Sequence, residues 1–106
     1  MNTPSIVMAT RQSPLAKQYQ QDPQLAMVTD SASSRSDYTA MADPLHGQVS
    51  AGGFTIPIAV HTAVGGEGDG AVPGDILCAA LASCVDSTLR IVANRLNLDL
   101  HSLDVR

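Results

Sequence analysis

The sequence has few aromatic residues and few cysteines, and each scarcity narrows the class of protein. Its 106 residues include one Phe, two Tyr and no Trp, so aliphatic side chains and Met must form most of any core. One soluble domain of this size buries only ~65% of the surface that its unfolded chain exposes. A second subunit could therefore help to complete the core. In the reducing compartment that we expect for this chain, the two cysteines are predicted to be free thiols and not a structural disulfide.

Basic residues and targeting segments are also scarce. Six Lys and Arg residues stand against ten Asp and Glu residues, which gives a net charge of −4. This balance lacks the basic stripe that is typical of nucleic-acid binding proteins. Residues 1–8 have neither the basic segment nor the apolar run of a signal peptide, and no apolar run approaches the ~20 residues of a membrane span. We therefore expect a cytoplasmic protein with no nucleic-acid or membrane partner.

The first 41 residues carry weak structural signals. Residues 1–12 are polar and are expected to be extended or loose. Ser13 suits a helix cap and Pro14 the first helical position, which predicts a short helix over residues 15–21. Residues 25–29 and 38–41 are each predicted to form a short strand. The Ser-rich residues 30–36 between them are predicted to form a turn.

A hairpin is the clearest strand prediction in the sequence. Residues 46–50 and 54–62 are extended patterns separated by Ala51-Gly52-Gly53, and paired glycines between such runs favour a tight turn. Apolar side chains alternate along the second run, at Phe54, Ile56, Ile58 and Val60. Pro57 cannot donate a ladder hydrogen bond, which predicts that this strand is bulged or lies at a sheet edge.

A glycine-rich loop over residues 65–70 leads into the longest helical pattern, which we place at about residues 73–96 and end at Asn97. The loop matches neither dinucleotide-binding nor P-loop spacing, so it is predicted to be a flexible loop. Asp86 and Arg90 are spaced for a surface ion pair on the helix. Residues 103–106 have the pattern of an opening strand, so we expect the ancestral domain to continue beyond Arg106.

Both cysteines fall on this predicted helix. Cys78 and Cys84 are six residues apart, which places them ~120° apart around the axis and ~9–10 Å apart along it. A disulfide needs Cα atoms within ~7 Å, so the two thiols cannot bridge while the helix is intact. Proximity to the helix start favours Cys78 as the reactive thiol, whereas both residues also suit plain packing.

The helix resembles the central helix of the OsmC/Ohr family, the osmotically inducible and organic-hydroperoxide-resistance proteins. The resemblance rests on the glycine-rich loop, Pro73, the small-residue run up to Cys84, and the segment 87–93, and it covers mainly residues 64–105. It implies an α+β fold in which antiparallel strands pack on a long central helix, as an intertwined homodimer. It also implies a thiol peroxidase in which Cys84 is the peroxidatic residue, with an organic hydroperoxide as substrate and a lipoyl-type dithiol as reductant.

Several residues depart from the family pattern. The family's resolving cysteine belongs to a second helix, and Gly74 stands where an acidic residue follows the proline. Asp75 is then the candidate acidic partner of the thiol, and Arg35, ahead of Arg11, is the candidate activating cation. His61 is a candidate substitute for that cation.

No cofactor and no metal are expected, because His46, His61 and His101 lack metal-ligand spacing. The alternative hypothesis is a truncated or degenerate member of the family without peroxidase activity. Such a protein would serve as a dimerisation or binding domain.

Overall fold

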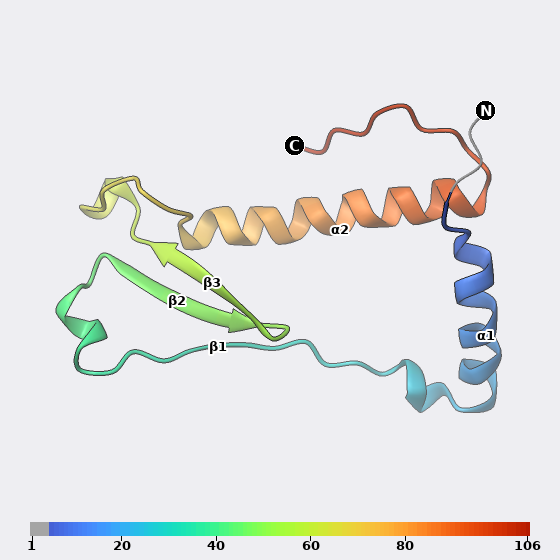
Figure 1. Ribbon diagram of the computed structural model, residues 1–106, viewed down its shortest axis with the longest axis horizontal. Helices are drawn as coiled ribbons and strands as arrows, with labels where there is room; N and C mark the ends of the chain where they lie inside the picture. Colours follow the sequence, from blue (N-terminus) through green and yellow to red (C-terminus); the bar gives the residue numbers. More distant parts are fainter. Residues whose placement is uncertain (1–4) are drawn as a thin grey trace. The chain divides into compact units, whose positions relative to one another are not determined.

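A computed structural model describes residues 5–106 and shows an α+β chain, which confirms the predicted fold class (Figure 1). Two α-helices and one antiparallel sheet of order β1-β2-β3 make up the regular structure of these residues. The elements in chain order are α1 (Met8–Gln21), β1 (Ala32–Ser34), β2 (His46–Ala51), β3 (Phe54–Ala59) and α2 (Pro73–Arg95).

The contacts of the chain divide it into two units, which are described separately. The first unit contains the residues up to Val28 together with Ala80–Arg106, and the second unit contains Thr29–Ala79. The second unit therefore holds the whole sheet and the first turns of α2. The prediction of a single, truncated OsmC-like domain over residues 1–106 stays a prediction.

Helix α1, in the first unit, begins at Met8, so the predicted start at residues 13–15 is wrong and Pro14 lies inside the helix. The predicted loose segment is wrong from residue 8 onward, and residues 1–4 lie outside the described residues. The reason is a cap from a distant part of the chain. The Met8 N–H donates to Asn94 Oδ1 at 2.8 Å, and Asn94 Nδ2 donates to the Ile6 carbonyl at 2.8 Å.

The two short strands predicted near the start of the chain are wrong. Residues in both segments form 3-10 turns instead, at Pro23–Ala26 and Ala40–Ala42. Aspartate side chains start these turns, because Asp22 Oδ1 accepts the Gln24 N–H and Asp37 Oδ1 accepts the Ala40 N–H. The predicted Ser-rich turn contains strand β1, which pairs with β2 although all three of its residues are exposed.

The predicted hairpin is confirmed in β2 and β3, where Ala51 pairs with Phe54 across a two-residue turn. Gly52 and Gly53 have φ values of 58° and 80°. Positive φ at both central residues is the requirement of a type I′ turn, which suits the twist of a hairpin. Strand β3 ends at Ala59, earlier than the predicted residue 62, because Thr62–Val64 forms a 3-10 turn.

Strand β3 lies at the sheet edge, as Pro57 predicts. The Val60 N–H donates to the Leu45 carbonyl at 2.9 Å, on the side of the strand that faces β2. The Ala59 N–H donates to the Ala71 carbonyl at 2.8 Å, on the side that faces away from β2. Backbone N–H groups alternate between the two sides of a strand. The nitrogen of Pro57 therefore shares the outer side of Ala59, where no ladder donor is needed.

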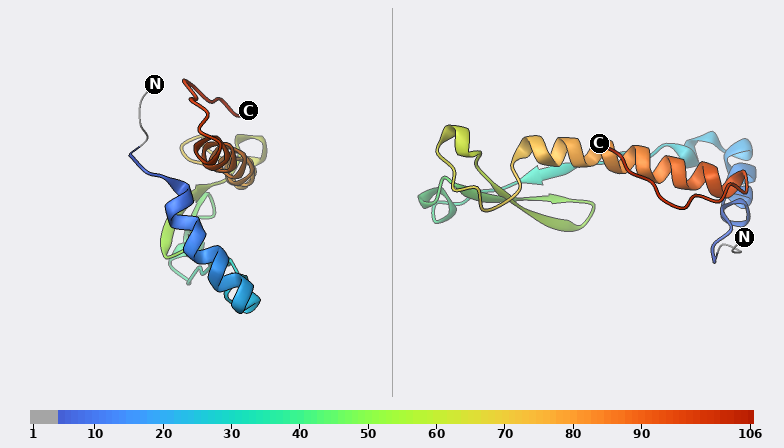
Figure 2. Two further views of the ribbon diagram at one scale, coloured as in Figure 1. Left: turned by 90° about the vertical axis from the view of Figure 1, so that its right-hand side faces the viewer. Right: turned by 90° about the horizontal axis from the view of Figure 1, so that it is seen from above.

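Helix α2 is one continuous helix (Figure 2) and confirms the prediction for residues 73–96 to within a residue at its end. Asn97 ends it with φ 56°. The Leu98 N–H donates to the Ala93 carbonyl at 2.8 Å and the Asn97 N–H to the Asn94 carbonyl at 3.2 Å, which is a Schellman motif. Residues 98–106 form no strand, so the opening strand predicted at 103–106 is wrong.

By length and composition alone, the 23 residues of α2 would suffice to cross a membrane. The expectation that no apolar segment reaches that length is therefore wrong. Core helices of soluble proteins have the same composition, so this property does not place α2 in a bilayer. Among residues 5–106, only Ala59 and Ala93 are buried.

Candidate functional site

Helix α2 presents both cysteines as free, exposed thiols. Pro73 begins the helix, and Oδ2 of Asp75 accepts the Val72 N–H at 3.2 Å, which is half of a capping box. Cys78 follows in the second turn and belongs to the second unit, whereas Cys84 lies near the middle of the helix and belongs to the first unit. Exposure makes each thiol accessible to a small oxidant in solution.

An exposed apolar stripe runs along α2 beside Cys84. Helical periodicity places its members within about 120° of one another around the axis. The most exposed of them are Leu77, at 65%, and Leu81 and Leu96, both at 63%. The stripe consists of Leu77, Leu81, Val85, Leu89, Val92 and Leu96. A continuous apolar surface of this kind marks an interaction site more often than a solvated face.

Asp86 and Arg90 form the ion pair that their spacing predicts. Arg90 Nε donates to Asp86 Oδ2 at 2.8 Å, and a terminal guanidinium nitrogen lies 2.7 Å from the same oxygen. A guanidinium nitrogen of Arg90 also lies 3.4 Å from Ser87 Oγ. Arg90 is therefore engaged by neighbours on its own helix.

The residues proposed to activate Cys84 lie in the second unit. Asp75 is exposed in the first turn of α2, where its carboxylate is engaged with the Val72 backbone. Arg35 is exposed directly after β1 and takes part in none of the ion pairs found among residues 5–106. Their roles toward Cys84 remain proposals.

His61, the candidate substitute for the activating cation, lies at the start of a short turn. It precedes the 3-10 turn Thr62–Val64, and its Nδ1 accepts the Ala63 N–H at 2.8 Å. The side chain of His61 therefore caps this turn.

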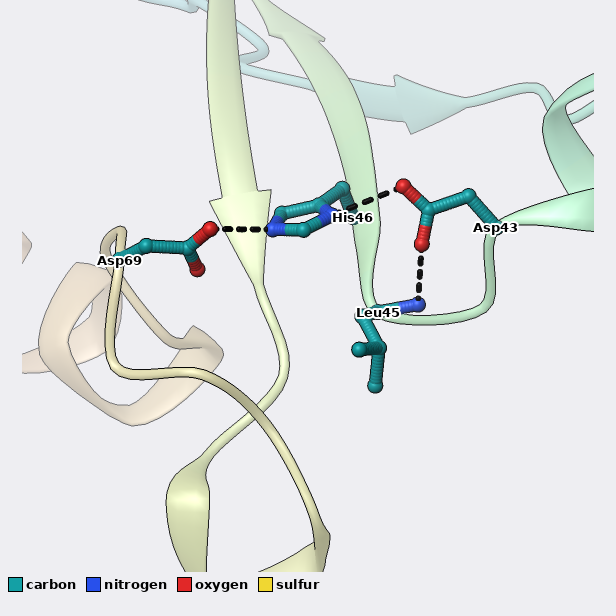
Figure 3. Close-up of polar contacts among 4 residues, drawn as sticks. All are labelled: Asp43, Leu45, His46 and Asp69. Atoms are coloured by element: carbon teal, nitrogen blue, oxygen red, sulfur yellow. Dashed lines mark hydrogen bonds and ion pairs between the residues drawn. The ribbon is translucent and has the colours of Figure 1, made fainter.

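The densest polar cluster of the second unit is centred on His46, at the start of β2 (Figure 3). Its Nδ1 lies 2.8 Å from Asp43 Oδ2 and its Nε2 lies 2.6 Å from Asp69 Oδ2. Both ring nitrogens face carboxylates, so both donate when the ring is an imidazolium. The hydrogen bonds that His46 donates to Asp43, and secondly to Asp69, raise the pKa of His46, and the hydrogen bond with His46 lowers the pKa of Asp43.

Two backbone features hold this cluster in place. Asp43 Oδ1 accepts the Leu45 N–H at 3.0 Å, which orients its carboxylate. Gly66, in the loop that leads to Asp69, passes so close to Val60 that a Cβ would lie 1.7 Å from the Val60 carbonyl oxygen. The loop therefore returns to the strands by a path open only to glycine.

An open cavity of about 520 Å³ lies in the same unit. Its wall is mostly apolar, with contributions from Met41, Leu45, Ile58 and Val64, and it includes the polar side chains of Asp43 and His46. Cavities of this size and composition accommodate small organic molecules. Asp43 and His46 are therefore accessible from this cavity.

This cluster was not predicted from the sequence, where the three histidines were compared only for the spacing of metal ligands. The partners of His46 are carboxylates, of which Asp69 comes from the glycine-rich loop. The available signals were the Asp43-x-x-His46 spacing and two acidic residues in a loop that follows a hairpin.

Comparison of the chain with protein-family models, curated proteins and solved structures finds no match in any of the three. The structure itself shows a small α+β chain in which one long helix, α2, carries two exposed cysteines. The resemblance to the OsmC/Ohr family stays a prediction from the residues around Pro73 and Cys84.

Proposed function

We propose that this chain is an OsmC-like thiol peroxidase subunit in which Cys84 reduces organic hydroperoxides in the cytoplasm. The observation that carries the proposal is a free, exposed thiol at Cys84 beside an apolar stripe on one long helix. Apolar side chains next to the thiol favour a peroxide with an alkyl or acyl group. An α+β chain in which a strand hairpin precedes a long helix agrees with the resemblance.

The proposed reaction uses one thiol of the chain at a time. The Cys84 thiolate attacks the O–O bond, an alcohol leaves after taking up a proton, and the cysteine becomes a sulfenic acid. One thiol of a small dithiol reductant then displaces water and forms a mixed disulfide. Its second thiol attacks that disulfide, releases the Cys84 thiolate and leaves as an oxidised cyclic disulfide. Cys78 takes no part, because the helix holds it too far from Cys84.

Activation of the thiol is assigned to Arg35, oriented by Asp75. A guanidinium near the sulfur would stabilise the thiolate over the thiol and so raise the reactive fraction at neutral pH. The two residues belong to the second unit and Cys84 to the first.

A second copy of the chain is part of the proposal. The stripe on α2 leaves six large aliphatic side chains between 44% and 65% exposed. Burying them against an equivalent stripe would provide the apolar contacts that the described residues lack. We therefore propose a homodimer in which α2 forms part of the interface.

A specific observation favours the alternative, a degenerate relative without peroxidase activity. Asp75 is engaged in capping α2 and His61 in capping a turn, so two of the residues considered for activation already have structural roles. In that case the chain would act through its apolar helix as a dimerisation or binding domain.

Turnover of an organic hydroperoxide by the full chain tests the proposal. The assay uses cumene hydroperoxide with dihydrolipoamide, and compares the wild type with Cys84→Ser and Cys78→Ser. We expect Cys84→Ser to lose activity to background and Cys78→Ser to keep it within about two-fold, because only the Cys84 thiolate attacks the peroxide. A dimedone adduct on Cys84, found by peptide mass spectrometry, would identify the sulfenic acid.

The matched pair of variants separates the outcomes. Loss of activity in Cys78→Ser with full activity in Cys84→Ser would transfer the role to Cys78. If the folded wild type shows neither turnover nor a dimedone adduct, the peroxidase proposal is wrong and the degenerate, non-enzymatic alternative is supported.

A further inference from the structure

We propose that His46, Glu67 and Asp69 bind a divalent transition-metal ion, best matched by Zn²⁺, and that Asp43 positions the His46 ring for it. The proposed site lies wholly in the second unit. It involves neither cysteine and does not depend on the proposed peroxidase function.

The geometry of the three ligand side chains suits a single ion. One ligand atom from each of His46, Glu67 and Asp69 lies within 4.8 Å of the other two. Bonds of about 2.0–2.2 Å to Zn²⁺ bring neighbouring ligand atoms to roughly 3.5 Å from one another. Closing the group by about an ångström requires only small rotations of exposed side chains on a glycine-rich loop.

An oriented imidazole distinguishes this group from an ordinary patch of acidic residues. Asp43 contacts Nδ1 of His46 at 2.8 Å and is itself held by the Leu45 N–H. It therefore fixes the tautomer with a proton on Nδ1 and leaves Nε2 pointing toward Asp69 (Figure 3). A carboxylate that orients a histidine ligand through its other nitrogen is a recurrent arrangement in metal sites.

The charges of the cluster favour a cation at the position of the Nε2 proton. Asp43, Glu67 and Asp69 place three carboxylates around this point. A divalent ion there would be compensated by these carboxylates. One nitrogen and two carboxylate ligands favour Zn²⁺ over Mg²⁺ or Ca²⁺, which prefer oxygen alone.

Three protein ligands leave coordination positions for water or a small ligand. The adjoining cavity, whose wall includes Asp43 and His46, gives access to the group. The class of ligand that such a centre would accept is a small molecule with one anionic or carbonyl oxygen and an apolar remainder.

Isothermal titration of the full chain with ZnCl₂ and MgCl₂ tests the site. The measurement is made in a Cys78→Ser/Cys84→Ser background, because exposed thiolates are themselves Zn²⁺ ligands. We expect one equivalent of Zn²⁺ to bind, at least about ten-fold more tightly than Mg²⁺.

Variants assign the ligands. Glu67→Gln should weaken Zn²⁺ binding at least about ten-fold and leave the fold intact, because Glu67 takes part in none of the hydrogen bonds between described residues. His46→Gln should abolish binding. Asp43→Asn should weaken it by about 10–100-fold, the usual effect of removing a residue that orients a ligand. His101→Gln, which removes an exposed histidine of the first unit, is the matched control.

Two results would overturn the proposal. One is Zn²⁺ affinity in folded His46→Gln and Glu67→Gln equal to that of the parent chain. The other is an equal loss of affinity in His101→Gln, which would indicate scattered surface binding.

Discussion

Single polar side chains hold together segments of this chain that lie far apart in sequence. Asn94 joins the start of α1 to α2 through two hydrogen bonds, and His46 joins Asp43 to Asp69. Both are partly or largely exposed, so water competes for their partners and each bond contributes modestly to stability. Their main effect is to hold segments together: Asn94 holds the start of α1 against α2, and His46 holds the loop with Asp69 near Asp43.

At the residue scale, His46 should make the stability of the second unit depend on pH. The pKa of His46 is raised from 6.5, so its stabilising contribution is complete below that value and is lost as pH rises through the raised pKa. The pKa of Asp43 is lowered from 3.8, so its contribution is present above that value and is lost as pH falls through the lowered pKa. The cluster therefore stabilises the fold most between these two ordinary values.

Urea unfolding of the wild type and His46→Gln, measured from about pH 4 to pH 9, checks this prediction. The difference between the two proteins should be largest near pH 5 to 6 and should shrink toward pH 9. Asp69→Asn serves as a partial variant, because it leaves Asp43 in place and should lower the pKa of His46 in an NMR titration. A stability difference independent of pH would contradict the role of the ion pairs.

At the element scale, α1 depends on its cap from α2. Asn94→Ala removes the acceptor of the Met8 N–H and the donor to Ile6, and should destabilise the first unit by about 1–2 kcal/mol. Hydrogen exchange of the Met8 amide is the direct measurement, and it should accelerate in the variant. Asn94→Asp keeps the acceptor and should preserve most of that protection. Unchanged exchange in Asn94→Ala would show that the cap does not hold α1.

The glycine-rich loop offers a matched pair of substitutions. Gly66→Ala would place Cβ 1.7 Å from the Val60 carbonyl oxygen, so the loop must move away and stability should fall by more than ~2 kcal/mol. Gly74→Ala meets no atom within 4 Å and lies in the first turn of α2, where Ala should stabilise by about 0.5–1 kcal/mol. Denaturant midpoints measure both, and equal effects of the same sign would refute the packing argument.

The elements that sequence reasoning predicted correctly are those whose causes are local. Gly52-Gly53 specifies the hairpin turn through its own φ angles, and Asn97 ends α2 through its own backbone conformation. The start of α1 was missed because its cap, Asn94, is 86 residues away from Met8. Strand β1 was missed because its ladder with β2, and no apolar pattern of its own, makes it a strand.

The two candidate sites also differ in whether local sequence or a distant segment of the chain determines them. The helix that carries Cys84 was predictable, since Pro73 and a run of helix-forming residues define it locally. The cluster around His46 was not, because it requires the loop to return to β2 across 23 residues, between His46 and Asp69. A linear spacing rule for metal ligands cannot detect carboxylates that arrive by such a return.

At the scale of the whole molecule, the described residues expose much of the apolar surface that a stable protein would bury. Only Ala59 and Ala93 are buried among residues 5–106, whereas many large aliphatic side chains are exposed. A small domain without an aromatic core gains most from burying such a surface against another chain. The six side chains of the stripe on α2 are all large and aliphatic, which makes the stripe the strongest candidate for that contact.

The proposed homodimer predicts how single charges on α2 change the mass of the protein in solution. Leu81→Glu places a carboxylate in the middle of the stripe, and desolvating it in an interface costs several kcal/mol. Sedimentation equilibrium should therefore show the wild type near twice the monomer mass and Leu81→Glu shifted to the monomer. Ser83→Glu is the matched control, because helical geometry places residue 83 on the side of the axis opposite the centre of the stripe. It should leave the dimer intact. A monomeric wild type, or equal dissociation by both substitutions, would refute α2 as the interface and leave the stripe available for a different partner.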